Sequence, residues 1–123
     1  AWAGWENALA SIDSTGAGGL AQAEYARAFA RLENHYFSHG CFLTAEQQIM
    51  LNIDKIAHIP GIIVQGRFDM ICPPVSAYTL AGLWPASRLI MVPKAGHAMS
   101  EPRISAELIQ AMDSIAITKM NEN

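Results

Sequence analysis

The fold is decided by residues 59–97, "IPGIIVQGRFDMICPPVSAYTLAGLWPASRLIMVPKAGH". Two short apolar runs within this stretch, at 62–64 and 88–92, are bounded by Gly and Pro and are typical of buried strands. The segment between them, 74–84, is predicted to be a helix that prolines open and Pro85 ends. Strand, helix and strand in this order, with strands of the buried type, indicate a parallel unit of an α/β fold.

A further helix is predicted downstream of this unit. Glu101 and Pro102 open it, and its apolar residues recur at a helical period on one side: Ile104, Leu108, Ile109, Met112 and Ile115. Strands of a parallel sheet need cover on both faces, and this helix is suited to cover one of them. We therefore expect residues 52–123 to form an α/β region.

The upstream residues have a different pattern. Apolar residues spaced by three or four predict helices over 2–11 and 20–37, with the loop "STGAGGL" between them. Gly40 is suited to a left-handed helix cap, and a short helix is expected from Thr44, as its N-cap, to Leu51. Residues 1–51 are thus predicted to be all-helical.

Composition excludes several classes of protein. Of the 123 residues, 51% are hydrophobic and 15% are charged, which suggests either a well-filled core or surfaces that are covered by another partner. The net charge is −3 and the Lys and Arg residues are scattered, which argues against nucleic-acid binding. We expect no membrane span and no signal peptide. Cys41 and Cys72 form no CxxC motif, so we expect free thiols in a cytoplasmic protein.

An acid and a histidine follow the two predicted strands. Asp69 lies three residues past Gly66, and His97 lies in the small-residue turn "KAGHA" after the second strand. Because neighbouring parallel strands end at the same edge of a sheet, both loops should meet there. An Asp that accepts a hydrogen bond from one ring nitrogen leaves the other free to act as a base. Taken singly, Asp69 could be a turn former and His97 an ordinary loop residue, but jointly they favour a catalytic pair.

A nucleophile for this pair is not apparent. In α/β-hydrolases the triad runs nucleophile, acid, histidine, and the nucleophile lies in a Gly-x-Ser-x-Gly elbow. No serine of this chain is flanked by glycines two positions away on both sides. Ser14 and Ser38 come nearest, but neither follows a predicted strand.

Several long segments resemble proline iminopeptidases (prolyl aminopeptidases), α/β-hydrolases that remove an N-terminal proline from peptides. The similar segments are "WENA", "ARLENHYFSHGCF", "IDKIAHIPGIIVQGRFDMICP", "AYTLAGLWPASRLIMVPKAGHA" and "EPRISAELIQAMDSIA". The resemblance is to the C-terminal portion of the family. It implies that Asp69 and His97 are the triad acid and base. It also implies that residues 1–51 are part of a helical cap and residues 52–123 are the C-terminal part of the hydrolase core, with its last two parallel strands and flanking helices.

The resemblance also implies a substrate site. The family binds the free amino terminus of its substrate with cap glutamates, which match Glu6 and Glu33 here. Both residues also lie on apolar flanks of predicted helices, where a carboxylate is costly unless it is paired. The alternative is a glutamate that reaches water or pairs with Arg27 or Arg31.

Two further residues match positions near the pocket for the proline ring, namely Phe37 and Cys72, although simple packing would also explain them. The family needs no metal and no cofactor. His35 and His39, four apart on a helix, could hold a metal, but only two ligands are evident.

We expect the chain to lack peptidase activity by itself, because the serine elbow and the oxyanion-hole loop of the family have no counterpart in it. Such a fragment should self-associate as a homodimer or combine with the missing N-terminal half. Two functional classes stay open: part of a proline-specific serine aminopeptidase, or a non-catalytic remnant. A fragment of another α/β-hydrolase, such as an esterase, is a weaker alternative because it would not explain Glu6 and Glu33.

Overall fold

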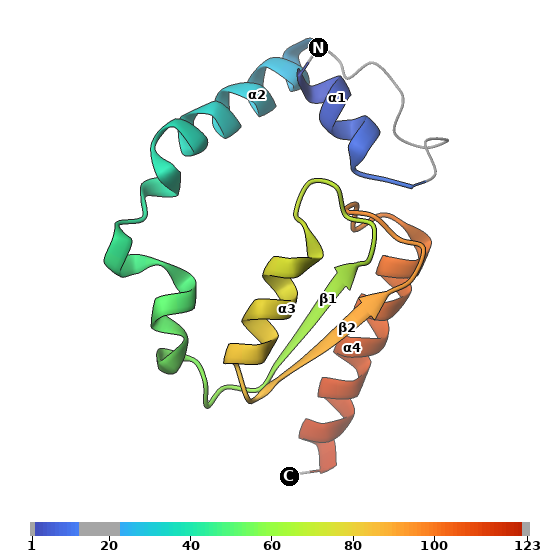
Figure 1. Cartoon of the computed structure of the whole chain (residues 1–123). Helices are drawn as coiled ribbons and strands as arrows, with labels where there is room; N and C mark the ends of the chain where they lie inside the picture. Colours follow the sequence, from blue (N-terminus) through green and yellow to red (C-terminus); the bar gives the residue numbers. More distant parts are fainter. Residues whose placement is uncertain (1, 13–22, 122–123) are drawn as a thin grey trace.

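The computed structural model describes residues 2–12 and 23–121 (Figure 1). The predicted loop "STGAGGL" and the start of the second predicted helix lie outside these residues. The elements in chain order are α1 (Trp2–Leu9), α2 (Ala23–Ser38), the 3-10 helices η1 (Gly40–Phe42), η2 (Ala45–Gln47) and η3 (Ile49–Lys55), then β1 (Gly61–Gly66), α3 (Pro74–Leu83), β2 (Ser87–Val92) and α4 (Pro102–Asn121).

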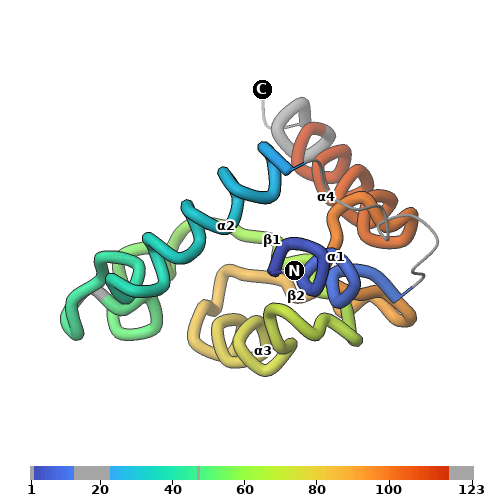
Figure 2. Tube along the Cα trace, turned by 90° about the horizontal axis from the view of Figure 1, so that it is seen from above, coloured from blue at the N-terminus to red at the C-terminus, as the bar shows by residue number. Residues whose placement is uncertain are grey.

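The two strands form a parallel sheet, as the sequence predicted. Their register runs from Gly61 opposite Ser87 to Gly66 opposite Val92. Helices α3 and α4 lie on opposite faces of this sheet (Figure 2). The described residues thus include a small α/β unit, of the kind expected for a fragment of an α/β-hydrolase. Helix α1 lies beyond the C-terminal ends of both strands (Figure 1).

The core of this unit is small and lies between the sheet and α4. Val92, Ala95 and Ile104 are buried, and Val64, Ile90 and Leu108 pack against them. The prediction of one continuous apolar side for α4 was only partly right. Ile109 and Met112 are 61% and 66% exposed. A sheet of two strands is too narrow to cover the whole apolar flank of the helix, so only the Ile104 side is buried.

The predicted helix from Thr44 to Leu51 was wrong in type and extent. Two 3-10 helices, η2 and η3, occupy this region, and the backbone at Gln48 between them is extended, with ψ 132°. That extended residue interrupts the helical hydrogen bonds, which is why no α-helix crosses it. Gly40 has φ +58°, as expected for a left-handed cap, and Cys41 and Phe42 also have positive φ.

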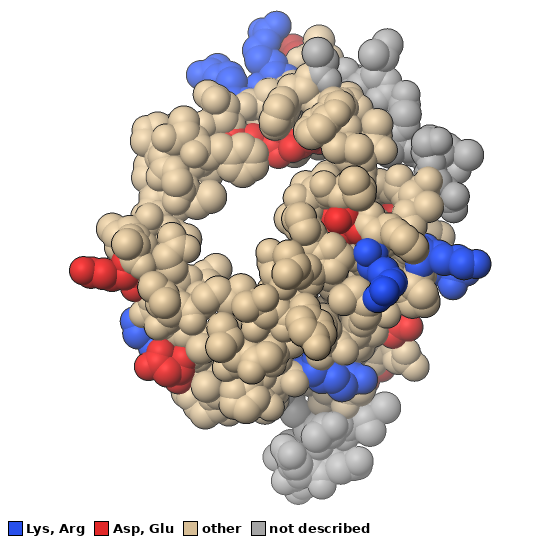
Figure 3. All heavy atoms as spheres, in the orientation of Figure 1, with Lys and Arg blue, Asp and Glu red and all other residues tan. Residues whose placement is uncertain are grey.

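The helical region is open. No residue of α2 is buried, and the apolar residues Tyr25, Leu32 and Tyr36 of its predicted stripe are exposed. Figure 3 shows that the molecule is hollowed between this helical region and the α/β unit. Within residues 2–12 and 23–121, we found no helix that is long and apolar enough to cross a membrane.

Gly66, the last residue of β1, lies against the loop that carries His97. A Cβ atom here would lie 1.9 Å from the carbonyl oxygen of Gly96 and 2.8 Å from that of Ala95. Both are backbone atoms that cannot rotate away, so Gly66→Ala should displace the loop and destabilise the fold by about 1–3 kcal/mol. Denaturant unfolding would measure this loss.

Gly82 provides the matched control for that substitution. It lies in α3, and a Cβ atom added to it would have no other atom within 4 Å. Gly82→Ala should therefore leave the fold intact and stabilise the helix by up to about 1 kcal/mol. Equal stability of the two variants would contradict the close contact at Gly66.

Candidate active site

The structure brings Asp69 and His97 together at the C-terminal edge of the sheet. Asp69 lies in the loop after β1 and His97 in the loop after β2. The Nδ1 atom of His97 is 3.0 Å from Oδ2 of Asp69. The side chain of Asp69 is 5% exposed, whereas that of His97 is 40% exposed. The carboxylate of Asp69 is therefore buried, whereas part of the His97 ring remains accessible to a substrate or to another side chain.

Backbone and side-chain donors surround the Asp69 carboxylate. Its Oδ1 atom accepts the N–H groups of Ile71 at 2.9 Å and Cys72 at 2.7 Å, and its Oδ2 atom accepts Nε2–H of Gln65 at 3.1 Å. Burial alone would raise the pKa of Asp69. The hydrogen bonds from the Cys72 amide, the His97 ring and the Ile71 amide outweigh burial, and the pKa is lowered.

This charge state decides what His97 can do. An ionised carboxylate only accepts hydrogen bonds, so the proton of the contact belongs to Nδ1 of His97. The Nε2 atom is then left without a proton in the neutral ring and is available as a general base. The same carboxylate would stabilise the imidazolium that forms when the base takes a proton.

Two carboxyl groups from separate helices meet near this pair. Glu6 of α1 shares a hydrogen bond with Glu33 of α2, and Nε1–H of Trp2 donates to Oε2 of Glu33 at 2.7 Å. Burial raises the pKa of Glu6, the hydrogen bond and charge of Glu33 raise it further, and the charge of His97 opposes them. Glu33 thus disfavours the ionised form of Glu6, and a cation bound between the two carboxyl groups would relieve this.

Burial distinguishes these acids from the other charged residues. Glu6 is 8% exposed and Asp69 is 7% exposed, and they are the charged residues that are buried in the described part of the chain. Charged groups are rarely buried unless they are paired. Glu6 and Asp69 lie in different elements and are both within electrostatic reach of His97. Acidic atoms are visible between α1 and α2, on the rim of the hollow (Figure 3).

The other two predicted substrate residues, Cys72 and Phe37, lie in different elements. Cys72 is in the acid loop, and desolvation together with the negative charge of Asp69 raises the pKa of its thiol. Phe37 lies on α2, where it is exposed and lines a cavity of about 290 Å³ with Trp2, Ala30 and Asn34. The cysteines at 41 and 72 are both free.

Sequence reasoning missed the residues that support the site. Gln65 binds the Asp69 carboxylate, and its signal was a lone polar residue within a buried apolar strand. Trp2 was expected only as an apolar helix residue, but its ring N–H is a partner of Glu33. Nothing local in the sequence indicates that contact, because the two residues belong to different helices.

The predicted histidine pair, His35 in α2 and His39 just after it, has no further metal ligands around it among the described residues. The rings of His35 and His39 have centroids 4.8 Å apart, and Nδ1 of His39 lies 2.7 Å from the carbonyl oxygen of His35. In the ranges that the structure describes, no three or more His, Cys, Asp or Glu side chains lie close enough to hold a metal ion.

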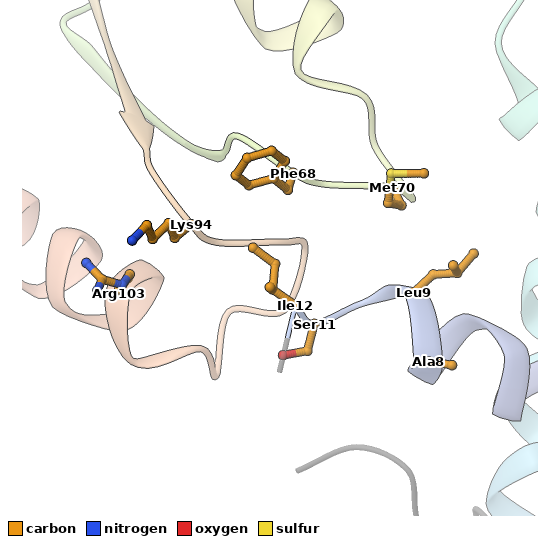
Figure 4. Close-up of a pocket in the computed structure, with 8 residues that line it drawn as sticks. All are labelled: Ala8, Leu9, Ser11, Ile12, Phe68, Met70, Lys94 and Arg103. Atoms are coloured by element: carbon orange, nitrogen blue, oxygen red, sulfur yellow. The ribbon is translucent and has the colours of Figure 1, made fainter. Parts of the chain in front are cut away.

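A cavity of about 540 Å³ borders the acid loop (Figure 4). Phe68 and Met70, on either side of Asp69 in the sequence, line it together with the end of α1. Lys94 and Arg103 lie at one end of the cavity, and Leu9 lies at the other. The cavity thus adjoins the candidate site, and its wall is mainly apolar.

The known proteins that we compare with this chain are proline iminopeptidases. It is 44% identical to a probable proline iminopeptidase of Leptolyngbya boryana over 98% of its length, and 42% identical to the proline iminopeptidase of Xanthomonas citri over 94%. It is also 46% identical to the proline iminopeptidase of Arabidopsis thaliana over 75% of its length. No family model matches the chain.

The match covers a minor part of each relative. The chain spans 38% of the length of the Leptolyngbya and Xanthomonas proteins and 24% of the Arabidopsis protein. The aligned part includes both loops of the acid and the histidine, since nearly all of this chain is aligned. The chain is therefore homologous to the proline iminopeptidases and corresponds to a C-terminal portion of them.

Proposed function

We propose that the chain supplies the acid, the base and the amino-terminus site of a serine aminopeptidase that releases N-terminal proline from peptides. One observation carries this proposal: Asp69 and His97 are in contact at the C-terminal edge of the sheet, and the Glu6–Glu33 pair lies near enough to this edge for the charge of His97 to act on Glu6. A base for acyl transfer beside a site for a cation is what an aminopeptidase needs.

In this mechanism the nucleophile belongs to the part of the relatives that this chain does not span. His97 takes the proton of a serine hydroxyl as the oxygen attacks the prolyl carbonyl carbon, and Asp69 stabilises the imidazolium. His97 then gives the proton to the leaving amine, and the C–N bond breaks. A water molecule, deprotonated by His97, hydrolyses the resulting prolyl ester, and the serine regains its proton.

The Glu6–Glu33 pair selects the substrate. A positively charged prolyl amine between the two carboxyl groups pairs with both of them and offsets the unfavourable effect of Glu33 on the ionisation of Glu6. A peptide with a blocked amino terminus offers no such cation and leaves a carboxylate buried without a partner. The Cys72 and Phe37 side chains are proposed to border the proline ring, and no metal or cofactor takes part.

The test requires the nucleophile. The chain would be joined to the preceding portion of the Leptolyngbya boryana relative, and this completed protein would be given prolyl p-nitroanilide. Release of p-nitroaniline by the completed protein, with none by the 123-residue chain alone, supports the proposal. Turnover by the chain alone that His97→Ala abolishes would overturn the assignment of the nucleophile to the missing portion.

A non-catalytic, self-associating fragment is the second candidate, favoured by exposed apolar surface. β1 pairs with β2 alone among the described residues, and large apolar side chains such as Leu51, Met70 and Tyr78 are more than two-thirds exposed. Exposed strand edges and apolar patches promote association. The chain alone should therefore be a dimer or larger by light scattering at micromolar concentration, and a monomeric mass would exclude this candidate.

A further inference from the structure

Glu101, the residue before α4, joins two distant parts of the candidate site. Both of its carboxylate oxygens accept the N–H of Gly96, at 3.0 and 3.1 Å. Its Oε1 atom also accepts the N–H of Ile12 at 3.2 Å. Gly96 is the neighbour of His97, and Ile12 follows the cap helix α1. One carboxylate thus connects the histidine loop to the segment that carries Glu6.

A second connection lies beside the first. The carbonyl oxygen of Ala10 accepts the N–H groups of both His97, at 2.9 Å, and Ala98, at 2.7 Å. Gly96 lies between the two connections, where a side chain would be crowded. A Cβ atom there would lie 2.9 Å from Oε1 of Glu101 and 3.1 Å from the Ala10 oxygen. The end of α1 and the histidine loop are therefore held as one unit.

We propose that Glu101 is a positioning residue that sets the separation between the amino-terminus site at Glu6 and the base at His97. This inference rests on the proposed function. Ala10 lies one helical turn after Glu6 and donates its N–H to the Glu6 carbonyl oxygen. A shift of the contacts at Glu101 and Ala10 would therefore also shift the turn that carries Glu6. The link therefore sets the distance from the site of the substrate amine to the site of the attacked carbonyl.

The geometry explains why a residue that contacts no substrate atom should matter. The amine and the carbonyl carbon of an N-terminal proline are joined through a single carbon atom, so both sites must be occupied at a fixed separation. A shift of about 1 Å in a reacting group can lower the rate on the order of 10²-fold. A charged acceptor with three hydrogen bonds is well suited to prevent such a shift.

The link itself can be tested in the 123-residue chain. Amide hydrogen exchange would be measured at Gly96 and Ile12 in the wild type, Glu101→Gln and Glu101→Ala. Exchange at both amides should be faster in Glu101→Ala, with Glu101→Gln in between because its one carbonyl oxygen still accepts. Unchanged exchange in Glu101→Ala would overturn the proposal, whatever the protein catalyses.

The positioning role is tested in the completed protein with two substrates. Glu101→Ala should lower kcat/KM for prolyl p-nitroanilide by on the order of 10- to 100-fold. Hydrolysis of p-nitrophenyl acetate, which has no amine to place, should change much less. Glu107→Ala, which removes a carboxylate within α4, should alter neither reaction.

The outcomes separate the two claims. Equal losses for both substrates would show that Glu101 only supports the histidine loop, and would overturn the spacing role. A wild-type completed protein that hydrolyses the ester but releases no proline would reject the proposed function, and the exchange measurement would still decide the link.

Discussion

His97→Ala in the completed protein should abolish proline release, with kcat for prolyl p-nitroanilide lowered on the order of 10⁴-fold or more. In the proposed mechanism His97 accepts and returns the proton at each step, with its ring oriented by the 3.0 Å contact to Asp69. Substrate binding through Glu6 and Glu33 should persist, so KM should change much less than kcat.

Asp69→Asn should approach the same loss while keeping the shape of the side chain. An asparagine can present an N–H to Nδ1 of His97, which would favour the wrong tautomer and leave no proton acceptor facing the nucleophile. A loss of about 10⁴-fold in kcat is typical of this change in a serine triad. His58→Ala, a histidine outside the site, is the control and should leave kcat unchanged. Activity retained in either loop variant would contradict the assigned pair.

Glu6→Gln and Glu33→Gln should each lower kcat/KM for the prolyl substrate on the order of 10²-fold, because truncating one partner of a buried ionic contact costs about 2–5 kcal/mol. In the proposed site, each substitution removes a charge that would pair with the prolyl ammonium. Steady-state kinetics on prolyl p-nitroanilide and p-nitrophenyl acetate would separate substrate selection from acyl transfer, since the ester has no amine. Glu24→Gln, on the exposed side of α2, is the matched control. If neither substitution affects prolyl turnover, the assignment of Glu6 and Glu33 as the amino-terminus site is wrong.

The same substitution at Glu6 should stabilise the fold. The folded-state pKa of Glu6 is raised above its unfolded value of about 4.3. The stability that this group contributes is therefore fully present below that unfolded value and is lost as the pH rises through the folded pKa. Glutamine resembles the protonated carboxyl, so Glu6→Gln should unfold at a higher temperature than the wild type at about pH 7. A lower unfolding temperature would mean that Glu6 is needed for packing, and the activity loss would then not report on substrate binding.

Asp69 has the opposite pH dependence. Its folded pKa is lowered, so its contribution is present above the unfolded value of about 3.9 and is lost as the pH falls through the folded pKa. The unfolding temperature of the wild type should therefore fall as the pH is lowered from about 5. In Asp69→Asn this fall should be smaller, because the substituted side chain does not titrate.

The parallel unit and the position of its acid and base could be predicted from the sequence. Two short apolar strands with a helix between them have a local pattern, because Gly, Pro and apolar residues act over short distances. The sequence predicted buried strands, whereas only the last residue of each strand is buried, since a sheet of two strands is covered only in part. The meeting of Asp69 and His97 followed from that pattern, since parallel neighbours end at one edge of the sheet. The sequence pattern did not predict that 3-10 helices replace the α-helix expected from Thr44 to Leu51. The extended backbone of a single residue, Gln48, causes this difference.

Contacts between distant segments were decided by the tertiary structure alone. Glu101 and Ile12 are 89 positions apart, and Trp2 and Glu33 are 31 apart, yet each pair is joined by a hydrogen bond. The sequence by itself determined the elements, the order of acid and histidine and the acids on apolar helix flanks. The packing of α1 against α2 decided that Glu6 meets Glu33. The packing of α1 against the histidine loop decided that Glu101 can link the segment of Glu6 to the loop of His97. The physical reason is that periodicity specifies which side of an element is apolar, whereas the partner of that side depends on how whole elements pack.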